Sequence, residues 1–133
     1  MGAWGRGPFE NDFAADWVYE LEAADDFGAV RTALSSVLES TGYLDALYGS
    51  IALAAAEVVA AARQQPTSPL PDTVGAWVAE HGSKLSNADV TLALASIDRV
   101  LAEDSELREL WHESDEHAWL TTVEDLRHRL GVG

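Results

Sequence analysis

Apolar residues recur along this chain at spacings of three and four, the period of helices that bury one face. In the first such segment, from Asn11 or Asp12 to about Ala24, Phe13, Trp17 and Leu21 fall on one side. Similar segments begin near residues 27, 46, 72, 87, 105 and 115, and no clear strand-like alternation occurs. The pattern predicts an all-α fold, a single-domain orthogonal helical bundle of about six or seven helices.

Residues that favour helix ends flank several of these segments. Asn11 and Asp12 are N-cap types before the first segment, and Asp25-Asp26 precede the second. Ser86-Asn87-Ala88-Asp89 resembles a capping box with Asp in place of the usual Glu. These signals predict where the helices start more sharply than the apolar spacing does.

The segment from Ala46 to Arg63 differs from the others because it is apolar nearly all round. Its larger side chains, Ile51, Leu53, Val58 and Val59, stand among alanines. A helix without a polar face is usually surrounded by other helices. We therefore expect this segment to be the central helix of the bundle.

Two segments predict loops. Residues 1–11 hold three glycines and one proline, yet Trp4 and Phe9 offer large apolar surfaces to bury. We expect an ordered N-terminal loop docked on the helices. Residues 64–71 hold three of the four prolines and predict a connecting loop. Each half of the chain looks too small for its own core, so residues 1–133 are interpreted as one domain.

Composition narrows the possible functions. The chain has no cysteine, which excludes disulfides, thiolate zinc sites and cysteine nucleophiles. Its net charge of −15 repels nucleic-acid phosphate and anionic lipid and favours a basic protein partner. The alternative is that the acidic surface only keeps the protein soluble. Because of this charge, we expect neither a nucleic acid nor a membrane as a partner. No secretory or membrane-spanning pattern is present, so we expect a cytoplasmic protein. The oligomeric state stays open.

The opening run has the form M-G-x-W-G-x-G-x-F-x-N-D and is followed by Asp16-Trp17. Later come the alanine-rich run at 54–61, Leu110-Trp111, and a closing L-x-x-R-L at 126–130. In these motifs the chain resembles the bacterial family known as domain of unknown function 4259, over almost its whole length. The resemblance implies a small bacterial cytoplasmic protein, and it supplies no activity, cofactor or catalytic residue.

Glu57 is the sharpest single candidate because it interrupts the apolar central segment. A buried carboxylate without hydrogen-bond donors would cost several kcal/mol. The N-terminal loop offers backbone amides, the Trp4 indole N–H and the Arg6 guanidinium. We expect Glu57 to clamp that loop onto the helices. The alternatives are a ligand-binding or catalytic carboxylate, or a solvent-exposed one.

Metal sites have weaker support. Asp12, Asp16 and Glu20 recur every four residues and form a carboxylate ridge, suited either to Mg²⁺ or Ca²⁺ or to a solvated helix flank. His112 and His117 are five apart, whereas a zinc-protease helix needs histidines four apart. We predict no catalytic residue, no cofactor and no metal ligand.

Two functions remain. The first is a non-catalytic protein-binding module of the immunity or antitoxin type, directed at a basic partner. The second is a small-ligand-binding protein or enzyme, with a pocket between the N-terminal loop and the central helix around Glu57. Tryptophans exposed in acidic surroundings would be interface anchors under the first. The structural or possible site residues are Trp4, Asn11, Asp12, Asp16, Trp17 and Glu57.

Overall fold

Seven α-helices follow one another in the computed structural model, which describes residues 9, 11–65 and 70–131. They are α1 (Asp12–Glu22), α2 (Gly28–Glu39), α3 (Ala46–Ala62), α4 (Asp72–His81), α5 (Asn87–Val100), α6 (Glu106–His112) and α7 (Glu116–Gly131), with the 3-10 turn η1 (Gly82–Lys84) after α4. Over the described ranges there is no sheet, and an isolated bridge joins Leu44 and Ser105. The all-α prediction is confirmed.

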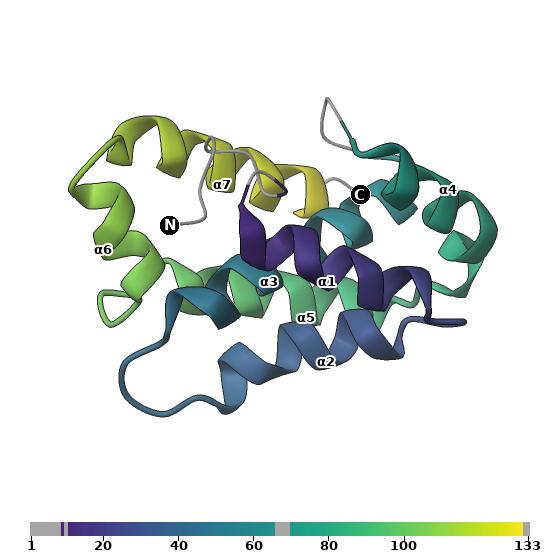
Figure 1. The fold of residues 1–133 in the computed structure, drawn as a ribbon, viewed down its shortest axis with the longest axis horizontal. Helices are drawn as coiled ribbons and strands as arrows, with labels where there is room; N and C mark the ends of the chain where they lie inside the picture. The colour runs from purple at the N-terminus through teal and green to yellow at the C-terminus, as the bar shows by residue number, and fades with distance from the viewer. Residues whose placement is uncertain (1–8, 10, 66–69, 132–133) are drawn as a thin grey trace.

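The central helix is α3. Every residue from Ala52 to Ala61 is buried, and α3 packs against each of the other six α-helices. Its alanines let these neighbours approach closely, and one cluster of buried apolar side chains takes members from α1 through α7. In Figure 1, α6 and α4 lie at opposite ends of the bundle, while α1 crosses in front of α3. The expectation that an apolar helix occupies the middle is confirmed.

Local capping residues set most helix starts. Asn11 Oδ1 accepts a hydrogen bond from the Ala14 amide at 2.8 Å, and Ser105 is the N-cap of α6. The predicted capping box of α5 forms between Ser86 and Asp89. At the start of α2, an Asp26 carboxylate oxygen accepts from the Gly28 amide at 2.8 Å, although Phe27 holds the N-cap position.

The start of α3 is capped from another helix. Asp45 holds the N-cap position, but its side chain makes no capping hydrogen bond. Glu106 Oε1 of α6 instead accepts from the Ala46 amide at 2.7 Å. A carboxylate near a helix N-terminus is also favoured by the helix dipole. This contact fixes α6 against the first turn of the central helix.

The two predicted loops fall largely outside the described residues. Positions 1–8 and 10, which include Trp4, and positions 66–69 are not described. Phe9 is 8% exposed and joins the core. Docking of the whole 1–11 loop stays a prediction.

Three of the five tryptophans are core residues. Trp17, Trp77 and Trp119 are buried, and the Trp77 indole N–H donates to the Ala24 carbonyl oxygen at 3.0 Å. Trp111 is half-buried and stacks on Trp119 with ring centroids 6.5 Å apart. The described tryptophans therefore serve packing more than surface recognition.

Candidate functional site

Glu57 lies in the middle of α3 and is 0% exposed. Both carboxylate oxygens accept hydrogen bonds from the Arg129 guanidinium of α7, at 2.8 and 2.7 Å. Arg129 also donates to Asp125 Oδ2 at 2.8 Å and to the Gln65 carbonyl oxygen at 3.0 Å. This bidentate geometry, with one N–H donated to each carboxylate oxygen, is the strongest form of carboxylate–arginine pairing.

Burial and the pairing with Arg129 shift the pKa of Glu57 in opposite directions. Burial raises the pKa of Glu57, while the hydrogen bonds and positive charge of Arg129 act against that rise. The pKa of Arg129 is raised in turn, first by its hydrogen bond to Glu57. The pair links α3 to α7, and Arg129 also reaches the chain just after α3.

The partner of Glu57 was not anticipated. The expected donors, Trp4 and Arg6, lie outside the described residues, so the clamp on the N-terminal loop stays a prediction. The alternative of a solvent-exposed Glu57 is wrong. Sequence spacing could not single out Arg129, because Arg127 in the same segment lies on the surface and pairs with Asp98.

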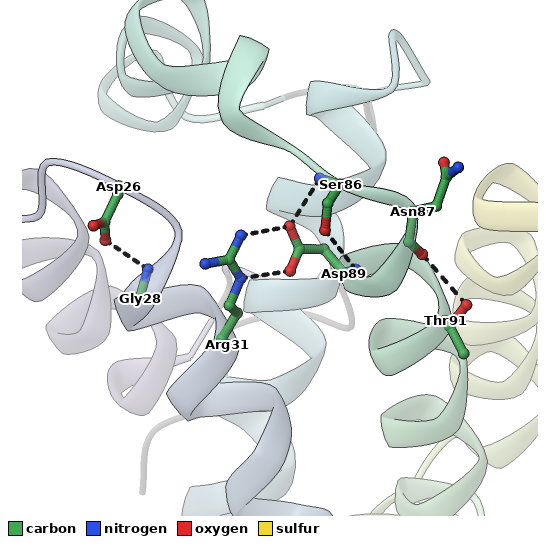
Figure 2. A network of polar contacts seen from close by, with 7 residues as sticks. All are labelled: Asp26, Gly28, Arg31, Ser86, Asn87, Asp89 and Thr91. Carbon is green, nitrogen blue, oxygen red and sulfur yellow. Dashed lines mark hydrogen bonds and ion pairs between the residues drawn. The ribbon is translucent and has the colours of Figure 1, made fainter.

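A second ion pair joins α2 to α5 (Figure 2). Arg31 Nε donates to Asp89 Oδ1 at 2.6 Å, and a terminal nitrogen donates to Oδ2 at 3.1 Å. Asp89 also accepts from the Ser86 amide at 3.0 Å as part of the capping box. Burial acts to raise the pKa of Asp89, but the hydrogen bonds from Arg31 and Ser86 outweigh it and hold the pKa below its usual 3.8.

The carboxylate ridge of α1 lies on the surface. Asp12, Asp16 and Glu20 are all exposed, and Trp17 between them is buried in the core. Within the part of the chain that the structure describes, no group of three or more histidine, aspartate or glutamate side chains could hold a metal ion. The exposure of the three side chains agrees with the alternative of a solvated flank.

The two histidines that resemble a zinc motif occupy different helices. His112 is the last residue of α6, and His117 lies in the first turn of α7. His112 Nδ1 lies 3.0 Å from Glu116 Oε1. The two histidines therefore do not share one continuous helix, which the zinc-protease motif requires.

A surface cleft of about 280 Å³ lies between Phe9, α1 and the start of α4. Its walls include Val18, Tyr19, Glu22 and Thr73. Glu57 does not line it. The predicted pocket around Glu57 has no counterpart in this cleft, and the carboxylate itself is sealed by Arg129.

Exposed apolar side chains gather instead where α6 meets the start of α3. We call Tyr43, Leu47, Tyr48 and Leu110 the α3–α6 patch; they are 50, 38, 45 and 48% exposed. The Tyr43 hydroxyl donates to Glu109 Oε1 at 2.6 Å, next to Leu110 in the chain.

Backbone contacts hold the two segments of the patch together. The Leu44 amide donates to the Asp104 carbonyl oxygen, and the Glu106 amide donates to the Leu44 carbonyl oxygen, both at 2.8 Å. Two residues before Leu44, Gly42 takes a φ of 79°, which a residue without a side chain adopts at little cost. Arg99 donates to its carbonyl oxygen at 2.6 Å.

Comparison with known families adds one finding. The model of a family described as a domain of unknown function (DUF4259) matches residues 2–122. The chain belongs to the DUF4259 family. No curated protein and no solved structure matches it.

For this DUF4259 protein, sequence reasoning missed the α3–α6 patch. Tyr43 and Tyr48 flank a predicted helix start, where the apolar period says little about which side chains are covered. Two tyrosines close to Asp45 were a signal in the sequence that could have indicated this patch. Tyrosine is common at interfaces, and a neighbouring aspartate disfavours burial. None of the described helices is long and apolar enough to cross a membrane.

Proposed function

We propose that this DUF4259 protein is a binding module for a basic protein partner, in the manner of a bacterial immunity or antitoxin protein. The observation that carries the proposal is an exposed apolar patch on a chain with a net charge of −15. Solubility alone would account for the charge. It does not account for four large apolar side chains gathered on one part of the surface.

The distribution of charge supports recognition at the surface. The buried carboxylates Glu57 and Asp89 are each paired with an arginine that ties two helices together. Because the chain has 23 acidic and 8 basic residues, most of its carboxylates have no cation of their own to neutralise them. Such a field attracts a basic protein and speeds its association.

The experiment is an affinity capture from the native host with the tagged full chain as bait. Mass spectrometry would identify partners at low salt and at raised salt, and an unrelated helical protein of equal net charge serves as control bait. We expect one protein with an excess of lysine and arginine, retained by this chain and not by the control. Direct binding of the purified pair then has to be measured. Recovery of no basic partner, or of the same proteins on both baits, would overturn the proposal.

A further inference from the structure

We infer that the α3–α6 patch is the docking surface, and that it takes a basic, amphipathic protein segment with an apolar centre flanked by lysine or arginine. This inference rests on the proposed function and adds to it the surface and the chemistry of the partner. Three independent features of the structure carry it: clustering, rigidity and charge.

The first feature is clustering. Six large apolar side chains are exposed among the described residues, and four of them form the α3–α6 patch. The other two, Tyr19 and Leu38, belong to α1 and to the end of α2. Scattered exposed apolar residues are ordinary, whereas several on neighbouring segments favour an interaction surface. Here the contacts of Glu109 with Tyr43 and of Glu106 with the Ala46 amide bring the two segments together.

The second feature is that the patch is held in place before any partner arrives. The Tyr43 hydroxyl is fixed by Glu109, and the Ala46 amide next to Leu47 is fixed by Glu106. Two backbone hydrogen bonds join residue 44 to residues 104 and 106. A surface ordered in advance loses less conformational entropy on binding. Tyrosine also supplies a large contact area at a low entropic cost.

The third feature is the charge around the patch. The hydrogen bond to Glu109 raises the pKa of Tyr43 to about 12, and nearby negative charges act in the same direction. Those charges belong to Glu109, Glu106 and Asp45. Glu109 accepts from the phenol at 2.6 Å, Glu106 accepts from the Ala46 amide at 2.7 Å, and Asp45 is the N-cap of α3, so all three carboxylates belong to the segments of the patch. They match lysine or arginine on a partner.

The arginines near this end of the bundle are engaged within the chain. Arg99 donates to the Gly42 carbonyl oxygen and pairs with Asp104, and Arg108 donates to the Leu101 carbonyl oxygen. A second copy of this chain would bring two acidic rims together, which costs free energy. Charge therefore favours a basic occupant over a second copy.

Two synthetic helical peptides of about 18 residues, five turns each, provide the probe. Both carry the same number of lysines; one has leucines along one face, and the other has serines at those positions. We expect fluorescence anisotropy to show at least roughly tenfold tighter binding of the leucine peptide to the full chain, a difference of about 1.4 kcal/mol.

Variants map the site. Leu47→Ser/Tyr48→Ser on α3 should bring the two peptides to within about twofold of each other, since only the apolar contribution is lost. Leu110→Ser, on the α6 side of the patch, should weaken binding of the leucine peptide. Tyr19→Ser removes the most exposed tyrosine, on α1, and should leave the preference unchanged. Thermal melts confirm that each variant folds.

The outcomes separate this inference from the proposed function. Loss of preference in Tyr19→Ser but not in the patch variants would assign binding to another surface. Equal binding of both peptides would exclude an apolar centre. Self-association abolished by Leu47→Ser/Tyr48→Ser would make the patch a contact between copies. Each of these overturns the inference while a basic partner could still be captured from the host; failure of that capture bears on the proposed function itself.

Discussion

At the scale of single residues, the two buried carboxylates each join two helices through an ion pair with an arginine, but in different surroundings. Glu57 is sealed in the middle of α3 by an arginine from α7, whereas Asp89 lies at a helix start and combines an arginine with its own capping box. Removing one partner of a buried pair costs more than the pair gains, because the other partner loses a counter-charge away from water. This applies most strongly to Arg129, whose side chain is 12% exposed, and less to Arg31, which is 46% exposed. Both residues therefore give sharp stability tests.

Glu57→Gln should destabilise the protein by about 3 kcal/mol, because it leaves the Arg129 guanidinium facing a neutral amide in a mostly buried site. Urea denaturation measures this free energy of unfolding. Asp98→Asn is the matched control, since it breaks the exposed pair with Arg127 and should cost less than about 1 kcal/mol. Equal losses in the two variants would mean that burial does not distinguish the pairs.

Asp89 gives a pH dependence of known sign. Its pKa in the folded protein lies below the usual 3.8, so its contribution to stability is present above that pH and is lost as the pH falls through the folded-state pKa. Asp89→Asn keeps a side-chain oxygen for the Ser86 amide but removes the charge facing Arg31. We expect the wild type to exceed this variant in unfolding free energy at pH 7, and the gap to shrink below about pH 4. A gap that widens in acid would contradict this assignment.

At the scale of elements, the helices follow from local sequence and their cross-links do not. The apolar spacing, the Asn11 cap and the Ser86 capping box depend on residues within one turn, so they could be predicted. Arg129 and Glu57 are 72 positions apart, and Glu106 and Ala46 are 60 apart. Helix packing decides which arginine or glutamate contacts a residue of another helix. The spacing of residues along the chain does not encode that packing.

The cap on α3 supplied by α6 can be tested directly. Glu106→Ala should cost about 1 kcal/mol of unfolding free energy, because the Ala46 amide loses its acceptor and the helix start loses a nearby negative charge. Faster hydrogen exchange at the Ala46 amide, measured by NMR, should accompany that loss. Glu103→Ala removes an exposed carboxylate from the preceding turn and should leave that exchange rate unchanged. If both variants behaved alike, the contact from α6 would not be what orders the start of α3.

At the scale of the whole molecule, the apolar centre and the acidic exterior have opposite effects on stability. Burial around α3 holds the helices together, while a net charge of −15 makes the folded surface repel itself. Repulsion between exposed charges is screened by salt, whereas a buried pair such as Glu57–Arg129 is screened much less. The same field that would attract a basic partner therefore costs the free protein some stability.

Raising sodium chloride from about 0.01 to 0.15 M shortens the Debye length from about 30 to 8 Å, and the Tm should rise by a few degrees. The difference in unfolding free energy between wild type and Glu57→Gln should stay nearly constant over this range, because that pair lies inside the screened surface. Scanning calorimetry of both proteins in the two salt concentrations checks the two effects together. A flat Tm would mean that the carboxylates are too far apart to repel strongly, and it would weaken the electrostatic case for a basic partner. A gap that closes with salt would place the Glu57–Arg129 pair in contact with solvent.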